Sequence, residues 1–278
     1  MVANPQIQEA AKVASSIALS LNKRGIQVTQ GNLSDETLRT RARTGEFNLL
    51  IAIGGDGTML RAGQICGPAE VPILGINVGR FGFLIEIQAD QWKDILNELV
   101  DGKYWLEKRM MLRAEHWRGN SCLGAWELLN EVAVSRGEIL RPVQLTAMVD
   151  GRFLSTYVAD ALIAATATGS TAYALAAGGP ILPPELRNIL LVPVAPHLSI
   201  DRAIVLAEGS SVGITINTDH QAVFSVDGQL PVPMLDNDRV EAYASEHNAQ
   251  FIRFQDPGYF YRNLTPHMSQ NPSTGNQR

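Results

Sequence analysis

Apolar residues recur every three to four positions in some segments of the first hundred residues and run without interruption in others. The helical period predicts amphipathic helices, whereas an unbroken apolar run indicates a parallel strand that is buried on both faces. Strands that alternate with helices are typical of a parallel α/β domain, which we expect over residues 1–104. We predict helices at 5–24, 35–44, 58–66 and 90–102, and strands at 26–29, 47–53 and 71–78.

Capping signals mark the ends of two of these helices. Asn4 precedes Pro5, an arrangement that suits the start of a helix, and Gly25 follows the last apolar position of the same segment. Ser34 precedes the second helix. We therefore expect Asn4 and Ser34 to be N-caps and Gly25 to end the first helix.

The pattern changes after Gly102. Short strand-like segments follow one another, separated by Gly, Pro and Asp-Gly turns, with little helical periodicity. This predicts a β-rich domain over residues 105–255. We expect residues 256–278 to return to the first domain and to end in a polar, disordered tail.

The segment Gly54-Gly55-Asp56-Gly57-Thr58 lies where a buried strand ends and a helix begins. One interpretation is a tight turn that needs Gly and Asp. The other is a phosphate cradle, because glycines allow close backbone approach and helix N-terminal N–H groups bind phosphate oxygens. The spacing is neither that of a P-loop nor that of the dinucleotide fingerprint. A carboxylate would repel a phosphate bound in such a cradle, so its presence indicates a chemical role, either binding Mg²⁺ or accepting a proton from an attacking hydroxyl.

Two further glycine-rich segments follow apolar strands. In residues 76–84, "INVGRFGFL", small residues allow a flat ring to lie against the backbone, with Phe81 and Phe83 able to cover it. The alternative is a turn whose phenylalanines enter the core. Residues 160–180 predict a strand and then an Ala-rich helix that begins at Ser170 and ends at Gly178, with hydroxyls at its N-terminus that suit an anion or a ribose. The alternative there is a capped helix without a ligand.

Several smaller features carry weaker signals. Asn130 and Glu131 fall within an apolar strand, "LLNEVAV", where burial costs energy without hydrogen bonds; an edge strand facing water explains them equally well. Asp150-Gly151 and Asp227-Gly228-Gln229 are typical of hairpin turns. The five histidines and two cysteines show no metal-ligand spacing, so we expect no structural metal site.

Composition narrows the class of protein. The chain has 278 residues, of which 45% are apolar and 18% charged, which is typical of a globular protein. A net charge of −5 without a basic stripe argues against nucleic-acid binding, and no apolar run is long enough for a membrane span. Two cysteines are too few for a disulfide framework, so we expect a cytoplasmic protein.

The order of the motifs resembles that of the NAD kinases. Gly-Gly-Asp-Gly-Thr is followed by Asn-x-Gly-x-x-Gly-Phe-Leu, then Asn-Glu, then Asp-x-Leu-Ile with Thr-Gly-Ser-Thr-Ala-Tyr and Gly-Gly-Pro, over residues 45–230. The resemblance implies an N-terminal parallel α/β domain, a C-terminal β-sandwich-like domain, and a site between them. It also implies transfer of a phosphoryl group from ATP, or polyphosphate, to the 2′-hydroxyl of the adenosine ribose of NAD, with Mg²⁺ or another divalent cation. Homodimers or homotetramers are common among such enzymes.

The same resemblance assigns roles to residues of this chain. Asp56 would be the base, Phe83 would cover the adenine, and Asp160 would bind the nicotinamide end or a ribose of a neighbouring subunit. Phosphates would lie against Gly55, Gly57 and Thr58, with Arg61 helping to neutralise them. The remaining positions would contact the nucleotide: Asn130, Glu131, Arg141, Thr171, Ala172, Tyr173, Ala176 and Gln229.

Four departures from the family pattern keep rival functions open. Ala161, Ala167 and Ala176 stand where Gly, Pro and Ser are frequent, and only three residues precede Asn4, where a first strand is usual. Either the sheet lacks that strand or the chain starts downstream of its natural beginning. A lipid kinase would share the glycine-acid loop, and a non-catalytic NAD-binding regulator would explain the alanines.

Overall fold

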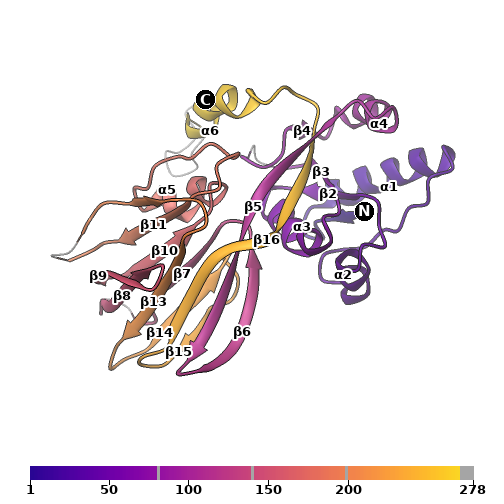
Figure 1. Ribbon diagram of the computed structural model, residues 1–278. Helices are drawn as coiled ribbons and strands as arrows, with labels where there is room; N and C mark the ends of the chain where they lie inside the picture. The colour runs from indigo at the N-terminus through magenta and orange to yellow at the C-terminus, as the bar shows by residue number, and fades with distance from the viewer. Residues whose placement is uncertain (80–81, 139–140, 198–199, 270–278) are drawn as a thin grey trace. The chain divides into compact units, whose positions relative to one another are not determined.

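The computed structural model describes residues 1–79, 82–138, 141–197 and 200–269 (Figure 1). Contacts divide the chain into two compact units, residues 1–108 together with 249 onward, and residues 109–248. The sequence-based bounds at 104 and 255 stay a prediction. The expected tail after residue 269 lies outside the described residues. None of the described helices is long and apolar enough to cross a membrane.

The α/β unit is built on a parallel sheet. Its strands lie in the order β1, β2, β3, and β3 also pairs with β4 and, through Ile73 and Phe251, with the end of β16. Every residue of the two central strands is buried, as their apolar runs predict. The strands are β1 (Val2–Ala3), β2 (Leu50–Gly54), β3 (Ile73–Asn77), β4 (Ile87–Gln88) and β16 (Arg239–Arg253).

Helices cover both faces of this sheet. The apolar stripe of α1 packs with Ile51, Leu74 and Leu96 in one core, whereas Met59 of α3 meets β3 at Gly75. The helices are α1 (Gln8–Lys23), α2 (Glu36–Arg43), α3 (Asp56–Cys66), α4 (Trp92–Val100) and α6 (Tyr259–Ser269), with a 3-10 turn, η1, at Gly67–Ala69.

Three predictions in this unit are wrong in detail. Helix α1 begins at Gln8 with Ile7 at the N-cap position, so Asn4 lies upstream of the cap site: its side chain accepts the N–H of Gln6 at 2.9 Å in the preceding turn, and its own N–H donates to Ile53 O at 2.9 Å and extends the pairing of β1. The cap of α2 is Asp35, which accepts the N–H of Leu38 at 3.2 Å, and not Ser34. Residues 26–29 form no strand, since the neighbouring β1 is only two residues long and pairs there only with Gly31.

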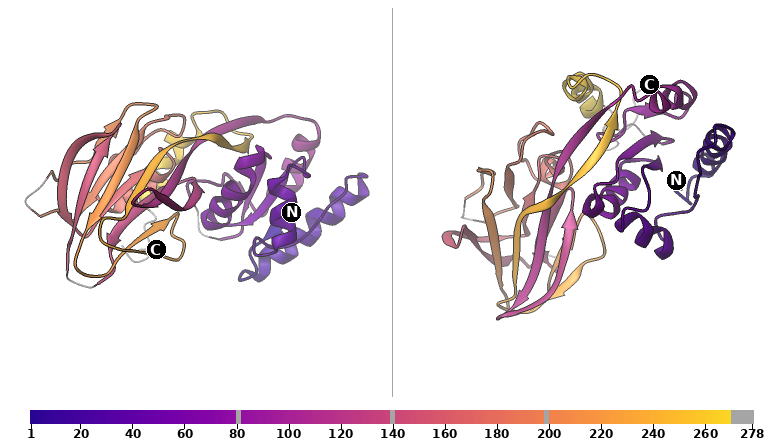
Figure 2. Two further views of the ribbon diagram at one scale, coloured as in Figure 1. Left: turned by 60° about the horizontal axis from the view of Figure 1, so that its bottom comes forward. Right: turned by 45° about the vertical axis from the view of Figure 1, so that its right-hand side comes forward.

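The second unit is a β-sandwich (Figure 2). One sheet has six antiparallel strands in the order β12, β11, β10, β7, β14, β15. In the other sheet, β16 pairs with β13 on one side and with β5 on the other. The pairing continues from β13 to β8 and β9, and from β5 to β6. The strands are β5 (Trp105–Arg118), β6 (Ser121–Leu128), β7 (Glu131–Arg136), β8 (Val143–Val149), β9 (Arg152–Ala159), β10 (Ala161–Ala165), β11 (Ile189–Val194), β12 (Ile204–Leu206), β13 (Ser211–Asn217), β14 (Ala222–Val226) and β15 (Val232–Met234).

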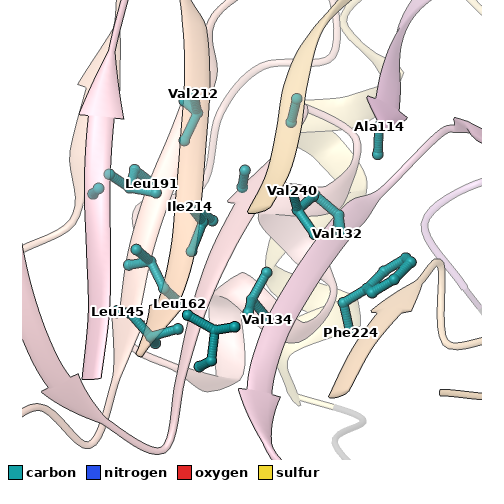
Figure 3. Close-up of a cluster of buried hydrophobic side chains, with 14 of the residues drawn as sticks. Ala114, Val132, Val134, Leu145, Leu162, Leu191, Val212, Ile214, Phe224 and Val240 are labelled. Atoms are coloured by element: carbon teal, nitrogen blue, oxygen red, sulfur yellow. The ribbon is translucent and has the colours of Figure 1, made fainter. Parts of the chain in front are cut away.

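Apolar side chains of both sheets form the core of the sandwich (Figure 3). Val134, Leu162 and Phe224 come from the six-stranded sheet and meet Leu145 and Ile214 of the other sheet. Strand β10 is buried on both faces, because residues of the 167–182 segment cover the side of its sheet that faces away from this core.

The Ala-rich helix predicted from Ser170 is much shorter than expected. It consists of a 3-10 turn, η2 (Gly169–Thr171), and one helical turn, α5 (Tyr173–Ala176). The buried hydroxyl of Ser170 donates to Ala167 O at 2.6 Å and accepts the N–H of Leu182 at 2.9 Å, which folds the segment back on itself. Gly178 then takes a positive φ of 84°, and the helix ends.

Candidate active site

The glycine-acid loop joins β2 to α3 at the carboxyl end of the parallel sheet, where ligands of α/β proteins bind. Gly55 is the N-cap residue in an extended conformation, and its carbonyl accepts the N–H groups of Thr58 and Met59 at 2.9 and 3.2 Å. Asp56 is therefore the first residue of the helix. The unpaired N–H groups of the first turn give this end of α3 a partial positive charge that favours anions.

The segment after Gly82 holds the carboxylate of Asp56. The N–H of Phe83 donates to one oxygen at 2.6 Å, and the N–H of Leu84 donates to the other at 3.1 Å. A Cβ atom at residue 82 would overlap the carboxylate of Asp56, so a larger residue there would displace this group. Two amides from a distant loop thus fix the direction in which this carboxylate points.

A cavity of about 570 Å³ opens over this loop. Five residues singled out from the sequence line it together: Gly55, Asp56, Gly57, Thr58 and Arg61. Asp56 is the one carboxylate among the described lining residues. Residues 3–7, Leu33 and Ser34 also line the cavity, although neither segment carries a ligand-binding motif from which this could be predicted.

The backbone of Phe83 has a role that the sequence did not predict. Its backbone N–H binds Asp56, and its side chain is half-buried. Phe81, the other phenylalanine of this motif, lies outside the described residues.

In the sandwich unit, Asn130 and Glu131 do not lie within one strand, contrary to the expectation. Strand β6 ends at Leu128 and β7 begins at Glu131, so that Asn130 sits in a bend. The carboxylate of Asp227 accepts the N–H groups of Leu129, Asn130 and Glu131 at 2.8, 2.7 and 3.1 Å. This buried acid supplies the partners that the bend would otherwise leave unsatisfied.

Asp227 also occupies the turn that its sequence predicts. Asp227 and Gly228 have φ values of 48° and 66°, and the N–H of Gln229 donates to Val226 O at 2.9 Å. The side-chain role was missed. A five-residue loop between β14 and β15, longer than a two-residue hairpin needs, was the available signal.

The segment 166–170, which ends in the Thr-Gly-Ser motif, packs directly on the bend at Asn130. The N–H of Thr166 donates to Asn130 O at 2.8 Å, and its hydroxyl donates to Leu129 O at 2.6 Å. A Cβ atom at residue 169 would lie 2.2 Å from Asn130 O, so Gly169 is required for this close approach. Two motifs that are far apart in the chain therefore form one cluster.

Glu131 is buried beside Asp227 and Tyr173. Burial, together with the negative charge of Asp227, raises the pKa of Glu131 from its ordinary 4.5 to about 8. A hydrogen bond from the backbone N–H of Tyr173 partly offsets this rise, because it favours the ionised carboxylate. At neutral pH this carboxyl therefore holds a proton and is able to donate a hydrogen bond.

This raised pKa makes stability depend on pH. Between pH 4.5 and 8 the folded protein keeps a proton on Glu131 that the unfolded chain has released, so the free energy of unfolding falls as pH rises. The loss from this group is at most about 5 kcal/mol, at 1.4 kcal/mol per pH unit. Glu131→Gln removes that contribution, so urea unfolding of the variant at pH 5 and pH 8.5 should show a much smaller decrease than that of the parent chain.

Glu246→Gln is the matched control for that comparison, because Glu246 is exposed on β16 of the same unit. It should leave the pH dependence unchanged. A parental decrease retained in Glu131→Gln would show that Glu131 is ionised throughout this range.

The remaining predicted residues are distributed over the sandwich unit. Thr171, Ala172 and Ala176 lie with Tyr173 on the segment that follows Gly169, and Gln229 is exposed next to the Asp227 turn. Arg141 is exposed, with its guanidinium 3.3 Å from Asp219.

Asp160 does not lie close to Glu131 and the bend at Asn130. Ala161 pairs with Ser135 and Ala165 with Glu131, so Asp160 lies beyond the opposite end of β7, roughly 15 Å from Glu131. There it forms an ion pair with Arg136 at 3.1 Å.

A glycine-acid loop at the carboxyl end of a parallel strand, facing a cavity, is the arrangement expected in a phosphotransferase of the nucleotide-binding α/β class. The family model of the ATP-NAD kinase N-terminal domain matches residues 30–104, and that of the ATP-NAD kinase C-terminal domain matches residues 129–254. The chain belongs to the ATP-NAD kinase family. The resemblance read from the motifs is thereby confirmed.

Individual relatives agree with this assignment. An NAD kinase of Chloroflexus aurantiacus is 37% identical over 261 residues, which cover 94% of each chain. An NAD kinase of Dehalococcoides mccartyi is 32% identical and covers 98% of this chain and 95% of its own.

Solved structures show the same fold. An Archaeoglobus fulgidus NAD kinase in complex with ATP has a TM-score of 0.74 at 26% identity, covering 92% of this chain and 94% of its own. Yeast NADH kinase complexed with NADH has a TM-score of 0.72 at 28% identity, with coverages of 81% and 67%. The predicted fold class, a parallel α/β domain followed by a β-sandwich-like domain, is confirmed.

Proposed function

We propose that this chain transfers the γ-phosphoryl group of ATP to the 2′-hydroxyl of the adenosine ribose of NAD, with Asp56 as general base. The 2′-oxygen attacks phosphorus, the bond to the β–γ bridging oxygen breaks, and ADP leaves. The hydroxyl proton passes to the Asp56 carboxylate. Membership of the ATP-NAD kinase family, NAD kinases among the similar proteins, and a similar NAD kinase solved in complex with ATP support this choice of donor and acceptor.

The observation that carries the proposal is the placement of Asp56. Its carboxylate stands at the N-terminus of α3, lines the cavity, and is oriented by the N–H groups of Phe83 and Leu84. These two bonds leave further lone pairs on the carboxylate oxygens, which can accept the hydrogen bond of a ribose hydroxyl. A general base needs this combination of fixed direction and access to substrate.

The phosphate chain of ATP is assigned to the same cavity. The backbone N–H of Gly57, in the first turn of α3, and the side chain of the exposed Arg61 supply positive charge there, and Thr58 lines the same cavity. The described residues contain no group of three His, Cys, Asp or Glu side chains fit to hold a metal ion. A divalent cation such as Mg²⁺ would come with ATP and would, when bound, help to neutralise the charge that develops during transfer.

The sandwich unit is assigned to NAD. Asn130 and the protonated carboxyl of Glu131 offer hydrogen bonds to ribose hydroxyls, and Tyr173 offers an aromatic ring that is partly exposed. Thr171, Ala172, Ala176, Gln229 and Arg141 remain proposed nucleotide contacts, as does Phe83 for the adenine ring. Asp160, at the far end of β7, fits the alternative of a ribose bound from a neighbouring subunit in a homodimer or homotetramer. We also propose a cytoplasmic location.

A direct assay tests the reaction. The purified chain is incubated with ATP, Mg²⁺ and NAD, and NADP is measured with an NADP-specific dehydrogenase; phosphorus NMR then locates the new phosphate at the 2′ position. We expect NADP only when both nucleotides are present. Parallel reactions with polyphosphate as donor and with NADH as acceptor define the substrate range.

The same assay separates the rival functions. Binding of NAD without any product would favour a non-catalytic regulator. Phosphorylation of a glycerolipid or sphingoid base, with NAD left unchanged, would favour a lipid kinase.

A further inference from the structure

Arg253 is the last residue of β16, and its guanidinium is buried in the α/β unit, with 2% of the residue exposed. Its Nε donates to Glu107 Oε2 at 2.8 Å, and Nη2 lies 2.7 Å from the same oxygen. Glu107 comes from β5, which pairs with β16 (Figure 1). The hydroxyl of Tyr259, on α6, donates to Glu107 at 3.0 Å.

The third contact of this guanidinium leads to the active-site loop. Nη1 of Arg253 donates to the carbonyl of Leu84 at 2.9 Å. The N–H of the same Leu84 donates to the Asp56 carboxylate at 3.1 Å. The carbonyl of Leu84 therefore binds Arg253, and its N–H binds Asp56.

The next residue of the chain reinforces this contact. The N–H of Phe254 donates to Glu86 Oε1 at 2.6 Å. Residues 84 and 86 are thus fixed by two consecutive residues, 253 and 254. A segment without regular secondary structure gains its conformation from the end of a strand that lies about 170 residues later.

Stability alone is a weak reason for such an arrangement. A buried ion pair is often no more stabilising than apolar side chains of the same size, because two charges must leave water. A buried guanidinium does, however, offer several donors in a rigid plane. It is suited to fixing a carbonyl and a carboxylate at once.

We propose that Arg253 is a positioning residue for Asp56. The ion pair with Glu107 and the hydrogen bond from Tyr259 hold the guanidinium, the guanidinium holds Leu84, and the amide of Leu84 aims the carboxylate at the substrate hydroxyl. This inference rests on the proposed role of Asp56 as base. Misplacement of a catalytic group by about 1 Å costs up to a hundredfold in rate, which sets the size of the expected effect.

The test is a kinetic double-mutant cycle. Arg253→Met should lower kcat about ten- to a hundredfold, while KM for NAD and for ATP changes less than threefold. Arg253→Lys, which keeps the charge but loses the planar fork, should lie between the parent and the methionine variant. In an Asp56→Asn background, Arg253→Met should cause little further loss, because the group that it positions is already disabled.

Arg262→Met is the matched control, since Arg262 pairs with Asp256 in the same unit but is exposed. It should leave kcat unchanged. Should Arg253→Met fail to fold, Arg253→Lys and Glu107→Gln serve in the same cycle.

Two results would overturn the positioning role. One is an unchanged kcat in the Arg253 and Glu107 variants, and the other is an equal loss in the parental and Asp56→Asn backgrounds, which indicates general damage to the fold. Failure of the proposed function looks different, because Asp56→Asn itself would then retain parental kcat.

Discussion

Asp56→Asn should lower kcat for NADP formation by about two to four orders of magnitude, the usual contribution of a general base. Asparagine keeps the size of the side chain and one acceptor oxygen, so at least one of the bonds from Phe83 and Leu84 remains possible. The free energy of unfolding should fall by only about 1 kcal/mol, the value of one hydrogen bond. Initial rates at saturating ATP and NAD, together with NAD affinity by calorimetry, measure the two effects separately.

Asp94→Asn is a suitable control, because Asp94 is an exposed acid in the first turn of α4 in the same unit. It should leave both the rate and the affinity unchanged. Parental kcat in Asp56→Asn would remove this residue from the role of base. A loss of NAD binding as large as the loss of rate would instead assign it to substrate binding.

Asp227→Ala should lower the free energy of unfolding by about 3–9 kcal/mol, because each unsatisfied buried backbone donor costs roughly 1–3 kcal/mol. Three N–H groups, those of Leu129, Asn130 and Glu131, lose their acceptor together. Alanine is also strained at the positive φ of 48°. Urea unfolding followed by circular dichroism measures the loss, and NAD affinity should fall as the bend at Asn130 loosens.

The chain contains a matched control for this variant. Asp150 also precedes glycine in a hairpin, with a φ of 51°, but its exposed carboxylate accepts a single backbone N–H, from Ser211 at 2.7 Å. Asp150→Ala shares the backbone strain but removes the acceptor of one backbone N–H in place of three, together with a longer hydrogen bond of 3.4 Å from the Ser211 hydroxyl. Equal losses in the two variants would mean that the contacts of Asp227 with the bend contribute nothing beyond the turn.

The local pattern of the chain was sufficient to predict the two central strands of the parallel sheet and the chemistry of the glycine-acid loop. Continuous apolar runs predicted β2 and β3, and the glycine-acid loop predicted a carboxylate at the start of a helix. These features depend on neighbouring residues, which decide whether a segment is buried on one face or two and whether a backbone can turn tightly. The order of the motifs was enough to identify the family.

Helix starts were less well predicted, because tertiary hydrogen bonds compete with local signals. The side chain of Asn4 accepts the N–H of Gln6 as a capping residue would, but the N–H of Asn4 pairs with Ile53 of the sheet, and the helix begins only at Gln8. Ser170 looked like the start of a helix, but its hydroxyl joins Ala167 to Leu182 and folds the segment back.

By itself the sequence determined the two fold classes, the loop that carries Asp56, and the identity of most groups that we assign to the nucleotides. Only the tertiary structure decided how those groups are aimed. Leu84 binds Asp56 across 28 positions of the chain, Asp227 binds the Asn130 bend across 97, and Arg253 reaches Leu84 across 169. The physical reason is that such bonds form between atoms brought together by sheet pairing and burial, and no local periodicity records which distant donor will meet which acceptor.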